Sequence, residues 1–258
     1  MSRLALDIDH VGLVGPDIHA TVAAFRKLGF RVTEPVELMG TAPNGSEQSL
    51  GQQSAHFVFG TTYVELSEVI RPGPGHHLAA WLGSGHALRI LILRADNIEA
   101  VREHAARAKQ NPSPVGEASR ILHYAGGAAA RFRWLALPAE CFPEALCGYV
   151  QHLTPELVFW PPMNNHPNGA AELTGLTLRA PDAEDAERRF GLLERPDAPG
   201  LLDIRPAQDG RRGFTGLHLR TRSLEQTAKA LNEAAQSFER TTGSIRVQAP
   251  GIHLIFSE

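Results

Sequence analysis

The sequence predicts an α+β fold in which repeated βαβββ modules pair into two cupped, antiparallel-rich sheets with flanking helices. Three observations support this. A strand, a turn with Pro, Asp or Asn, and an amphipathic helix recur four times at a period of about 65 residues. After the helices, the apolar pattern changes from helical spacing to the alternation of antiparallel strands. The chain is also 43% hydrophobic and 21% charged, which is the balance of an ordinary globular protein.

The first two modules carry the clearest patterns. A strand over 8–14 precedes Pro16-Asp17, then a helix that ends at Gly29, and strands 55–59 and 62–66 joined by Gly60-Thr61 form a hairpin. In the second copy, strand 90–95 precedes Asp96-Asn97 and a helix with apolar residues at 98, 101, 105 and 108. Strands over 131–137 and 146–153 follow. No module of this size buries both faces of its sheet, so we expect modules to pair.

The third and fourth modules are shorter. Their first strands, 173–178 and 214–219, both lie in the pattern Thr-Gly-Leu-x-Leu-Arg, and further strands are expected at 201–204, 244–247 and 252–256. A Pro-rich stretch separates the two halves of the chain. The predicted organisation is a paired-module domain over 1–160, a linker over 161–169 and a shortened module pair over 170–258.

Charge and hydropathy exclude several classes of partner. There are 25 Lys and Arg residues against 28 Asp and Glu, a net charge of −3, so no basic excess indicates a nucleic-acid partner. Apolar runs such as Leu91–Leu93 are far shorter than a membrane span, and the first seven residues lack the apolar core of a signal peptide. We therefore expect a cytoplasmic protein with no membrane or nucleic-acid partner.

Four short segments resemble the vicinal oxygen chelate superfamily, which includes glyoxalase I, extradiol dioxygenases, epimerases and bleomycin-resistance proteins. They are Asp-His-Val-Gly-Leu in the first strand, Tyr-Val-Glu-Leu closing the first module, Gln-His-Leu-Thr-Pro-Glu from position 151 and His-Pro-Asn-Gly from position 166. The last two look like those of bacterial glyoxalase-like domain proteins. The resemblance implies the fold over nearly the whole chain, whereas its chemical motifs lie in the first 170 residues.

The resemblance also implies a metal site. In this superfamily the ligands come from the first and last strands of each module, which places His10 and Glu65 as ligands, with Glu65 also the catalytic candidate. Ile90 stands at the corresponding first-strand position of module two, and His152 stands where the family usually has a glutamate. Such a set would suit a divalent ion of Fe, Mn, Ni, Co or Zn with open positions for substrate.

Strand alternation predicts the neighbours of these three residues. Side chains two apart share a face, so His10 is expected beside Ile8 and Gly12, Glu65 beside Tyr63 and Ser67, and His152 beside Gly148 and Val150. Small or polar neighbours would leave room for a ligand.

Four further residues are candidates for the substrate pocket. His56 and His123 lie on or beside strands that could edge the cup. Arg131 and Arg133 alternate with Phe132 and Trp134, so one face of their strand is cationic. That face is either solvated or, if it points into the cup, suited to an anionic substrate.

The function indicated is a metal-dependent vicinal oxygen chelate enzyme, a lyase, isomerase or dioxygenase, acting on a small oxygenated metabolite. The alternative is a non-catalytic protein that binds or sequesters a small molecule, as bleomycin-resistance proteins do, and the missing ligand at Ile90 favours it. In modules three and four, Gly175 and Gly216 stand at the ligand positions, so this half is expected to be structural, to form a homodimer surface or to form a wall of the N-terminal cup.

Overall fold

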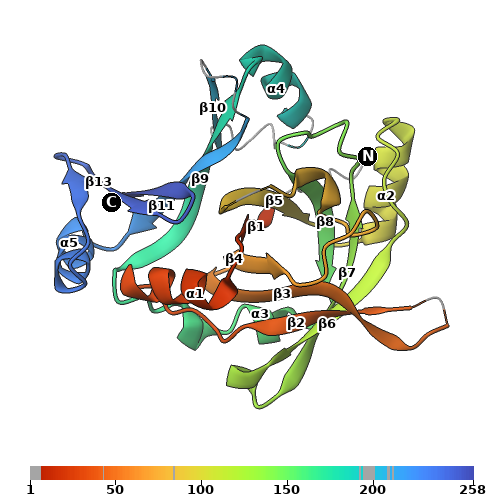
Figure 1. Ribbon diagram of the computed structural model, residues 1–258, viewed down its shortest axis with the longest axis horizontal. Coiled ribbons are helices and arrows are strands. Elements are labelled where there is room, and N and C mark those ends of the chain that lie inside the picture. Colours follow the sequence, from red (N-terminus) through yellow and green to blue (C-terminus); the bar gives the residue numbers. More distant parts are fainter. Residues whose placement is uncertain are drawn as a thin grey trace.

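Four modules follow one another along the chain, as the sequence predicts (Figure 1). The computed structural model describes residues 7–42, 44–83, 85–191, 193, 201–207, 210 and 212–258. Residues 1–6, on which the expectation about a signal peptide depends, lie outside that set. The elements of the first half are β1 (Ile8–Val14), α1 (Ile18–Lys27), β2 (Val36–Thr41), β3 (Glu47–Phe59), β4 (Thr62–Val69), the 3-10 turn η1 (Ala79–Trp81), β5 (Ala87–Arg94), α2 (Ile98–Arg107), β6 (Gly116–Leu122), the 3-10 turn η2 (His123–Ala125), β7 (Ala128–Ala136) and β8 (Leu146–His152).

The second half begins with two short helical segments and continues with the smaller modules. Its elements are α3 (Pro155–Val158), the 3-10 turn η3 (Pro161–Asn164), β9 (Ala170–Ala180), α4 (Ala183–Phe190), β10 (Leu202–Pro206), β11 (Gly213–Thr221), α5 (Leu224–Glu233), β12 (Phe238–Arg240), β13 (Ser244–Ala249) and β14 (Ile252–Ser257).

Helix starts are encoded locally, by the residues that precede each helix. Asp17, Asn97, Asp182 and Ser223 each accept a hydrogen bond from the backbone N–H three residues later. This is the N-cap interaction that satisfies a donor left free at a helix start. The turn residues that mark each module in the sequence therefore also begin the helices α1, α2, α4 and α5.

The first two modules close into a ring of eight strands. The strand order is β1-β4-β3-β2-β6-β7-β8-β5, and β5 pairs back with β1. The pairs β1–β4 and β5–β8 are parallel, and the other pairs of the ring are antiparallel. The join between β2 and β6 is the weakest, because it has only two residue pairs, Met39 with Ser119 and Gly40 with Ala118. A ring of eight strands has an interior just wide enough for side chains or one small ligand.

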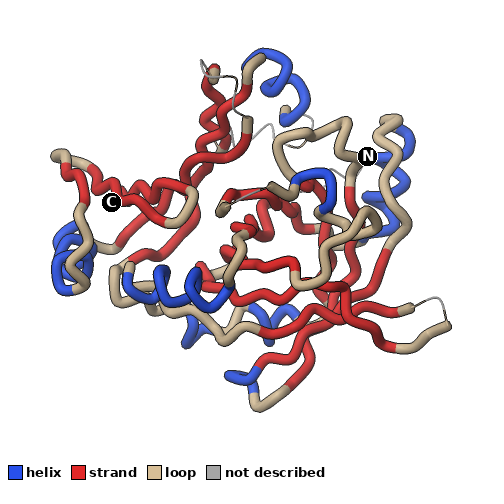
Figure 2. Tube along the Cα trace, in the orientation of Figure 1, coloured by secondary structure: helices blue, strands red, loops and turns tan. Residues whose placement is uncertain are grey.

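The second half extends the same sheet rather than forming a separate one. β9 pairs with β10 and β11, β11 continues through β14 to β13 and β12, and Phe214 of β11 pairs with Leu88 of β5. The prediction of paired βαβββ modules is confirmed, but the two expected sheets are one continuous fourteen-stranded sheet. Strands, drawn in red, make up much of both halves of the chain (Figure 2). One apolar core, which includes Phe25, Phe57, Phe190 and Phe256, joins the helices to the outer faces of the strands in both halves.

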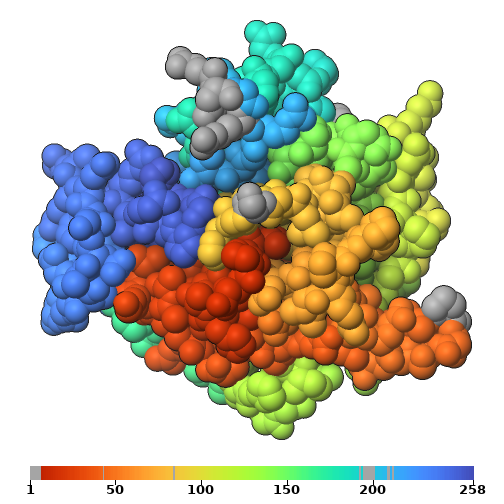
Figure 3. Space-filling model, in the orientation of Figure 1, coloured from red at the N-terminus to blue at the C-terminus, as the bar shows by residue number. Residues whose placement is uncertain are grey.

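The segment predicted as a linker packs against the first module. His166 and Asn168 are fully buried, and the Asn168 side chain donates to the carbonyl of Leu28. The C-terminal modules lie directly against the first module in the space-filling view (Figure 3). The domain boundaries at 160 and 170 remain a prediction. Among the described residues, no helix has the length and apolar character needed to cross a membrane.

Candidate functional site

Polar side chains occupy the middle of the eight-stranded ring, between two apolar clusters. One cluster contains Ile90, Ile92, Leu146 and Val150, and the other contains Val58, Tyr63, Leu122 and Met163. A cavity of about 60 Å³ is lined by residues of the first cluster and by Tyr63 of the second. Its lining is His10, Leu38, Gln52, Tyr63, Glu65, His77, Ile90, Ile92, Phe132, Trp134, Leu146 and Val150. This barrel cavity combines apolar walls with a few polar groups, the usual composition of a small-molecule site.

His10 is held by a buried carboxylate next to it in the chain. Its Nδ1 lies 2.9 Å from Oδ1 of Asp9, and its ring stacks on Tyr63 with 4.4 Å between centroids. Nε2 of His152 lies 3.0 Å from both oxygens of Asp9, and Arg94 Nε donates to Oδ2 at 3.1 Å. Burial alone would raise the pKa of Asp9, but the hydrogen bonds with His10 and His152 outweigh it and hold this pKa well below its ordinary value.

A β-bulge explains why Asp9 and His10 act together. In the ladder between β1 and β5, Ile8 faces Leu93 whereas His10 already faces Ile92, so Asp9 is an extra residue. The bulge breaks the alternation of the strand. Ile8 therefore packs into the outer core with the helices, whereas His10 lines the barrel cavity. The prediction that Ile8 and His10 share a face is wrong for this reason.

Glu65 stands at the centre of a second polar group. Its Oε1 accepts hydrogen bonds from Gln52 Nε2 at 2.9 Å and Ser67 Oγ at 2.6 Å. Its Oε2 accepts from Arg120 Nη1 at 3.3 Å. Gln52 in turn bonds His77, another residue of the cavity lining, through its Oε1 at 2.8 Å. Glu65 and Ser67 share a face as the alternation of β4 predicts.

Arg120 is the most unusual residue of the site. It is 1% exposed, and its guanidinium lies 5.2 Å from the ring centroid of Tyr63 and 6.0 Å from that of Phe132. Nη1 is bound to Glu65, whereas Nε and Nη2 have no described partner at ordinary hydrogen-bond geometry. Burial alone would lower the pKa of Arg120, but the neighbouring Tyr63 and Glu65 side chains outweigh it and raise this pKa above its ordinary value. Arg120 occupies the inward position of β6 between the buried residues Ala118 and Leu122. An arginine on the apolar face of an alternating strand is the sequence signal that could have identified it.

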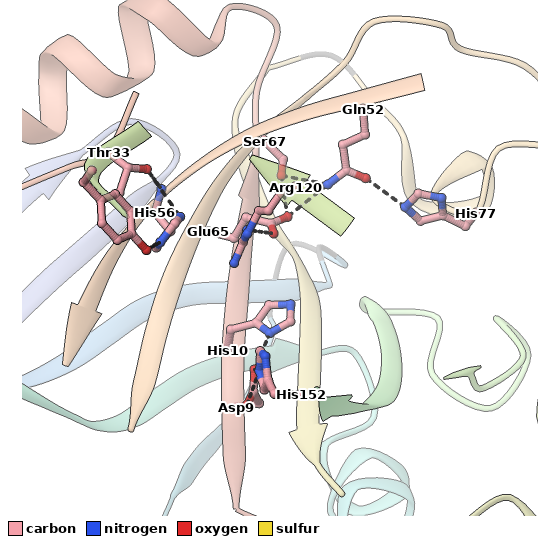
Figure 4. Close-up of polar contacts among 11 residues, drawn as sticks. Asp9, His10, Thr33, Gln52, His56, Glu65, Ser67, His77, Arg120 and His152 are labelled. Carbon is pink, nitrogen blue, oxygen red and sulfur yellow. Dashed lines mark hydrogen bonds and ion pairs between the residues drawn. The ribbon is translucent and has the colours of Figure 1, made fainter. Parts of the chain in front are cut away.

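The three residues predicted as metal ligands do not form one ligand set. His10 and His152 meet at Asp9, whereas Glu65 is turned to Gln52, Ser67 and Arg120 (Figure 4). Within the described ranges, no three His, Cys, Asp or Glu side chains are arranged to hold a metal ion. The Arg120 cation also takes the place at Glu65 that a divalent cation would need, because two positive charges in one buried site repel. The donor set as folded does not fit a metal ion.

The predicted pocket residues fall into two other places. His56 and His123 line a second cavity of about 210 Å³, where β2 and β6 diverge below their short join. His56 lies 3.2 Å from the Tyr124 hydroxyl through Nε2, and burial, together with nearby Arg120, lowers its pKa well below the ordinary value. Arg131 lies on the exposed side of β7 and lines a surface groove. Arg133 forms an ion pair of 2.6 Å with Glu99 of α2. The cationic face of β7 is thus outside the ring, and its aromatic face, with Phe132 and Trp134, lines the barrel cavity.

Comparison with known proteins agrees with this architecture. The sequence model of a family described as "Glyoxalase-like domain" matches residues 8–194. No curated protein matches the chain. A hypothetical protein from Staphylococcus aureus has a TM-score of 0.67 at 10% identity, with 98% of this chain and 99% of that chain covered.

Two solved enzymes also have this fold. A mutant of 4-hydroxymandelate synthase from Streptomyces coelicolor gives a TM-score of 0.60 at 11% identity, over 98% of this chain and 92% of that one. A variant of homoprotocatechuate 2,3-dioxygenase from B. fuscum gives a TM-score of 0.54 at 11% identity, over 99% of this chain and 72% of that one. At these identities the likeness concerns the fold.

Proposed function

The chain belongs to the glyoxalase-like domain family, and on this premise we propose that it is a vicinal oxygen chelate enzyme whose barrel cavity binds a small oxygenated metabolite and transfers a proton. The observation that carries the proposal is His10, a cavity-lining imidazole whose other side is bound to a buried carboxylate. The reaction class is an isomerase or lyase, since both move a proton next to a carbonyl or hydroxyl group.

His10 is the proposed proton acceptor. An ionised Asp9 accepts hydrogen bonds but cannot donate one. The Nδ1 of His10 therefore carries the proton, and Nε2 keeps its lone pair. Stacking on Tyr63 holds the ring in place. When Nε2 takes a proton from the substrate, the negative charge of Asp9 stabilises the imidazolium that forms. A carboxylate used in this way orients the base and stays ionised itself.

Glu65 is the proposed second acid–base residue. It lines the same cavity and is held by hydrogen bonds from Gln52 and Ser67 in addition to Arg120. Glu65 lies on β4, the strand that pairs with β1, two positions along from the partner of His10. A carboxylate and an imidazole in one cavity would allow a proton to be taken from one atom of the substrate and returned to another. The apolar side chains of Ile90 and Val150 keep bulk water from the reacting atoms.

The metal dependence expected from the family resemblance does not enter this proposal, because the Arg120 guanidinium occupies the free side of Glu65. Every step proposed here uses only side chains of this chain.

The test is exchange of carbon-bound protons with solvent. A panel of short α-hydroxy ketones and 2-oxo acids is incubated in D₂O with wild-type protein, His10→Gln and His19→Gln, and the loss of the proton signal next to the carbonyl is followed by NMR. His19 is exposed on α1 and serves as the matched control. We expect exchange in the wild type and in the control. In His10→Gln the exchange rate should be at least about 100-fold lower. Equal rates in wild type and His10→Gln would contradict the proposal.

A binding protein without catalysis is the second candidate, and the apolar character of the cavity wall favours it. The same experiment separates the two, because a sequestering protein binds members of the panel and exchanges none of their protons.

A further inference from the structure

A second cavity lies in the wall of the ring, apart from the barrel cavity. This side cavity, of about 210 Å³, lies where β2 and β6 separate on one side of their two-residue join. Beyond that join, β2 pairs only with β3 and β6 only with β7 among the described residues. The two cavities have no lining residue in common. They approach each other at His56, a residue of the side cavity, whose ring meets that of Tyr63 edge to face with 5.5 Å between centroids.

The neutral polar groups that line the side cavity already satisfy one another. The Tyr124 hydroxyl donates to a backbone carbonyl of α3 at 2.9 Å, so its oxygen accepts from Nε2 of His56 at 3.2 Å. Burial, and then the nearby Arg120 cation, lower the pKa of His56, so its Nδ1 carries no proton and accepts from the Thr33 hydroxyl at 3.3 Å. Figure 4 shows Thr33 and His56 at its left, apart from the polar groups around Glu65. A ligand against these groups gains no new hydrogen bond, so the part of it that enters the side cavity is apolar.

The size of the side cavity suits an apolar group of about one ring. Its apolar walls include three buried residues, Val32, Leu122 and Met163, and the half-buried Val36. An apolar cavity of about 150 Å³ is large enough to bind benzene. At about 210 Å³, the side cavity admits a body of that size and leaves space for a group attached to it.

The charge at the rim of the side cavity is positive. Arg31 is exposed there, and its Nη1 donates to the carbonyl of Pro162, which is a neutral group. Glu34 is the only carboxylate among the described residues of the lining, and it is paired with Arg26 at 2.6 Å. Two guanidinium groups against one carboxylate leave a net positive charge at this rim. Because guanidinium groups bind carboxylates through paired hydrogen bonds, the rim favours an acid.

We propose that the side cavity is a second ligand site and that its ligand is a small carboxylic acid with an apolar body about the size of one ring. The apolar body occupies the space between the buried apolar walls, and the carboxylate lies at the rim beside Arg31. The inference goes beyond the reaction proposed for the barrel cavity, because neither His10 nor Glu65 lines the side cavity.

The test is titration with benzoate, followed through the methionine methyl signals by NMR. The chain has three methionines, Met1, Met39 and Met163, and substitution of each by leucine assigns its signal. Met163 lines the side cavity, whereas Met39 lines the surface groove that also contains Arg131 and serves as an internal control. The indole N–H signal of Trp134 reports on the barrel cavity in the same sample. Benzamide supplies the ring without the charge, and acetate supplies the carboxylate without the ring.

We expect benzoate to shift the Met163 methyl signal saturably and to leave the signals of Met39 and Trp134 unchanged. Acetate should not shift the Met163 signal at concentrations at which benzoate saturates it. Benzamide should bind the wild type about 3- to 5-fold more weakly than benzoate does, which is the range of an exposed ion pair. Benzoate should bind Arg31→Gln more weakly by the same factor, and should bind the control Arg188→Gln, at an exposed position of α4, as it binds the wild type.

A second variant tests the cavity itself. Val36→Phe places a ring in the side cavity and should weaken benzoate binding by about 10-fold or more, because the interior is close-packed once that space is filled. If Val36→Phe does not fold, Ile121→Trp replaces it, since Ile121 lines the same cavity and is exposed.

Three results would each overturn the inference: no saturable shift of Met163, equal affinity for benzamide and benzoate, or unchanged benzoate affinity in Arg31→Gln. A saturable shift of Trp134 in place of Met163 would put the acid in the barrel cavity, and would overturn it too.

Discussion

The buried pair of Glu65 and Arg120 makes a quantitative prediction about stability. Glu65 is 6% exposed and Arg120 is 1% exposed, with 3.3 Å between Oε2 and Nη1. Arg120→Met leaves the Glu65 carboxylate buried with only the neutral donors of Gln52 and Ser67. Glu65→Gln leaves the Arg120 cation buried without a counter-charge. Removing one partner of a buried pair costs about 3–5 kcal/mol, so each single variant should lose that much stability.

The double variant Glu65→Gln/Arg120→Met should lose much less than the sum of the two. It contains no unpaired charge, and the methionine side chain can fill the space between Tyr63 and Phe132. Replacing both members of a buried pair by neutral groups is often close to neutral in its effect on stability. We therefore expect a coupling energy of about 3 kcal/mol or more between the two positions. For a chain of 258 residues, each single variant should melt about 6–20 °C below the wild type.

The assay is urea unfolding of the four proteins, followed by tryptophan fluorescence and analysed as a double-mutant cycle. The control cycle uses Arg133→Met and Glu99→Gln, a pair of 2.6 Å whose side chains are 30% and 50% exposed. Solvent screens that pair, so its coupling should stay below about 1 kcal/mol. Equal coupling energies in the two cycles would refute the reasoning that burial strengthens the coupling between Glu65 and Arg120.

Three further predictions concern pH, the contact between the halves and metal removal. His166 accepts from the Arg31 N–H through Nδ1 and bonds the Val58 carbonyl through Nε2, and burial lowers its pKa to about 4. As the pH falls, the His166 imidazole is therefore protonated in the unfolded chain before it is protonated in the folded chain. The free energy of unfolding should fall by about 3 kcal/mol as the pH drops from roughly 6.5 to 4. In His166→Gln, urea midpoints should depend less on pH over this range. Arg189→Ala removes a bidentate ion pair of 2.7 Å between α4 and Glu144 in the first half of the chain, and should lower the stability measured by thermal unfolding by about 3 kcal/mol. The control Arg188→Ala, at an exposed position of the same helix, should lower it by less than about 0.5 kcal/mol. Treatment with EDTA should leave the His10-dependent proton exchange unchanged, since every proposed step uses side chains of this chain; a chelator-sensitive exchange rate would contradict that proposal.

The order of elements in each half was predictable because its signals are local. Asp17 and Asn97 cap α1 and α2 through atoms only three residues away, and period-two alternation places Glu65 and Ser67 on one face of β4. Such interactions depend on the nearest residues alone. The strands β2 and β6 were not predicted, since their mixed polar and apolar residues obscure the alternation, and they meet through only two residue pairs.

The candidate site was predictable only in part. Family position indicated His10 and Glu65, and both line the barrel cavity. The sequence did not predict that Asp9 takes part in the site, because strict alternation places it on the opposite face from His10. Only the bulge against β5 brings Asp9 and His10 into one hydrogen-bonded group. Arg120 was missed because nothing near it in the chain indicates that Glu65, 55 residues away, is its partner.

The amino-acid order alone determined the four modules, their capped helices and the faces of the regular strands, because these follow from interactions within a few residues. The tertiary structure decided which charges meet inside the ring. Closure of the ring brings β6 beside the first module, so that Arg120 rather than His152 contacts Glu65. His152 contacts Asp9 instead. The reason is that a buried charge is stabilised by whichever opposite charge the fold brings within hydrogen-bond distance, and that choice is made across the sheet rather than along the chain.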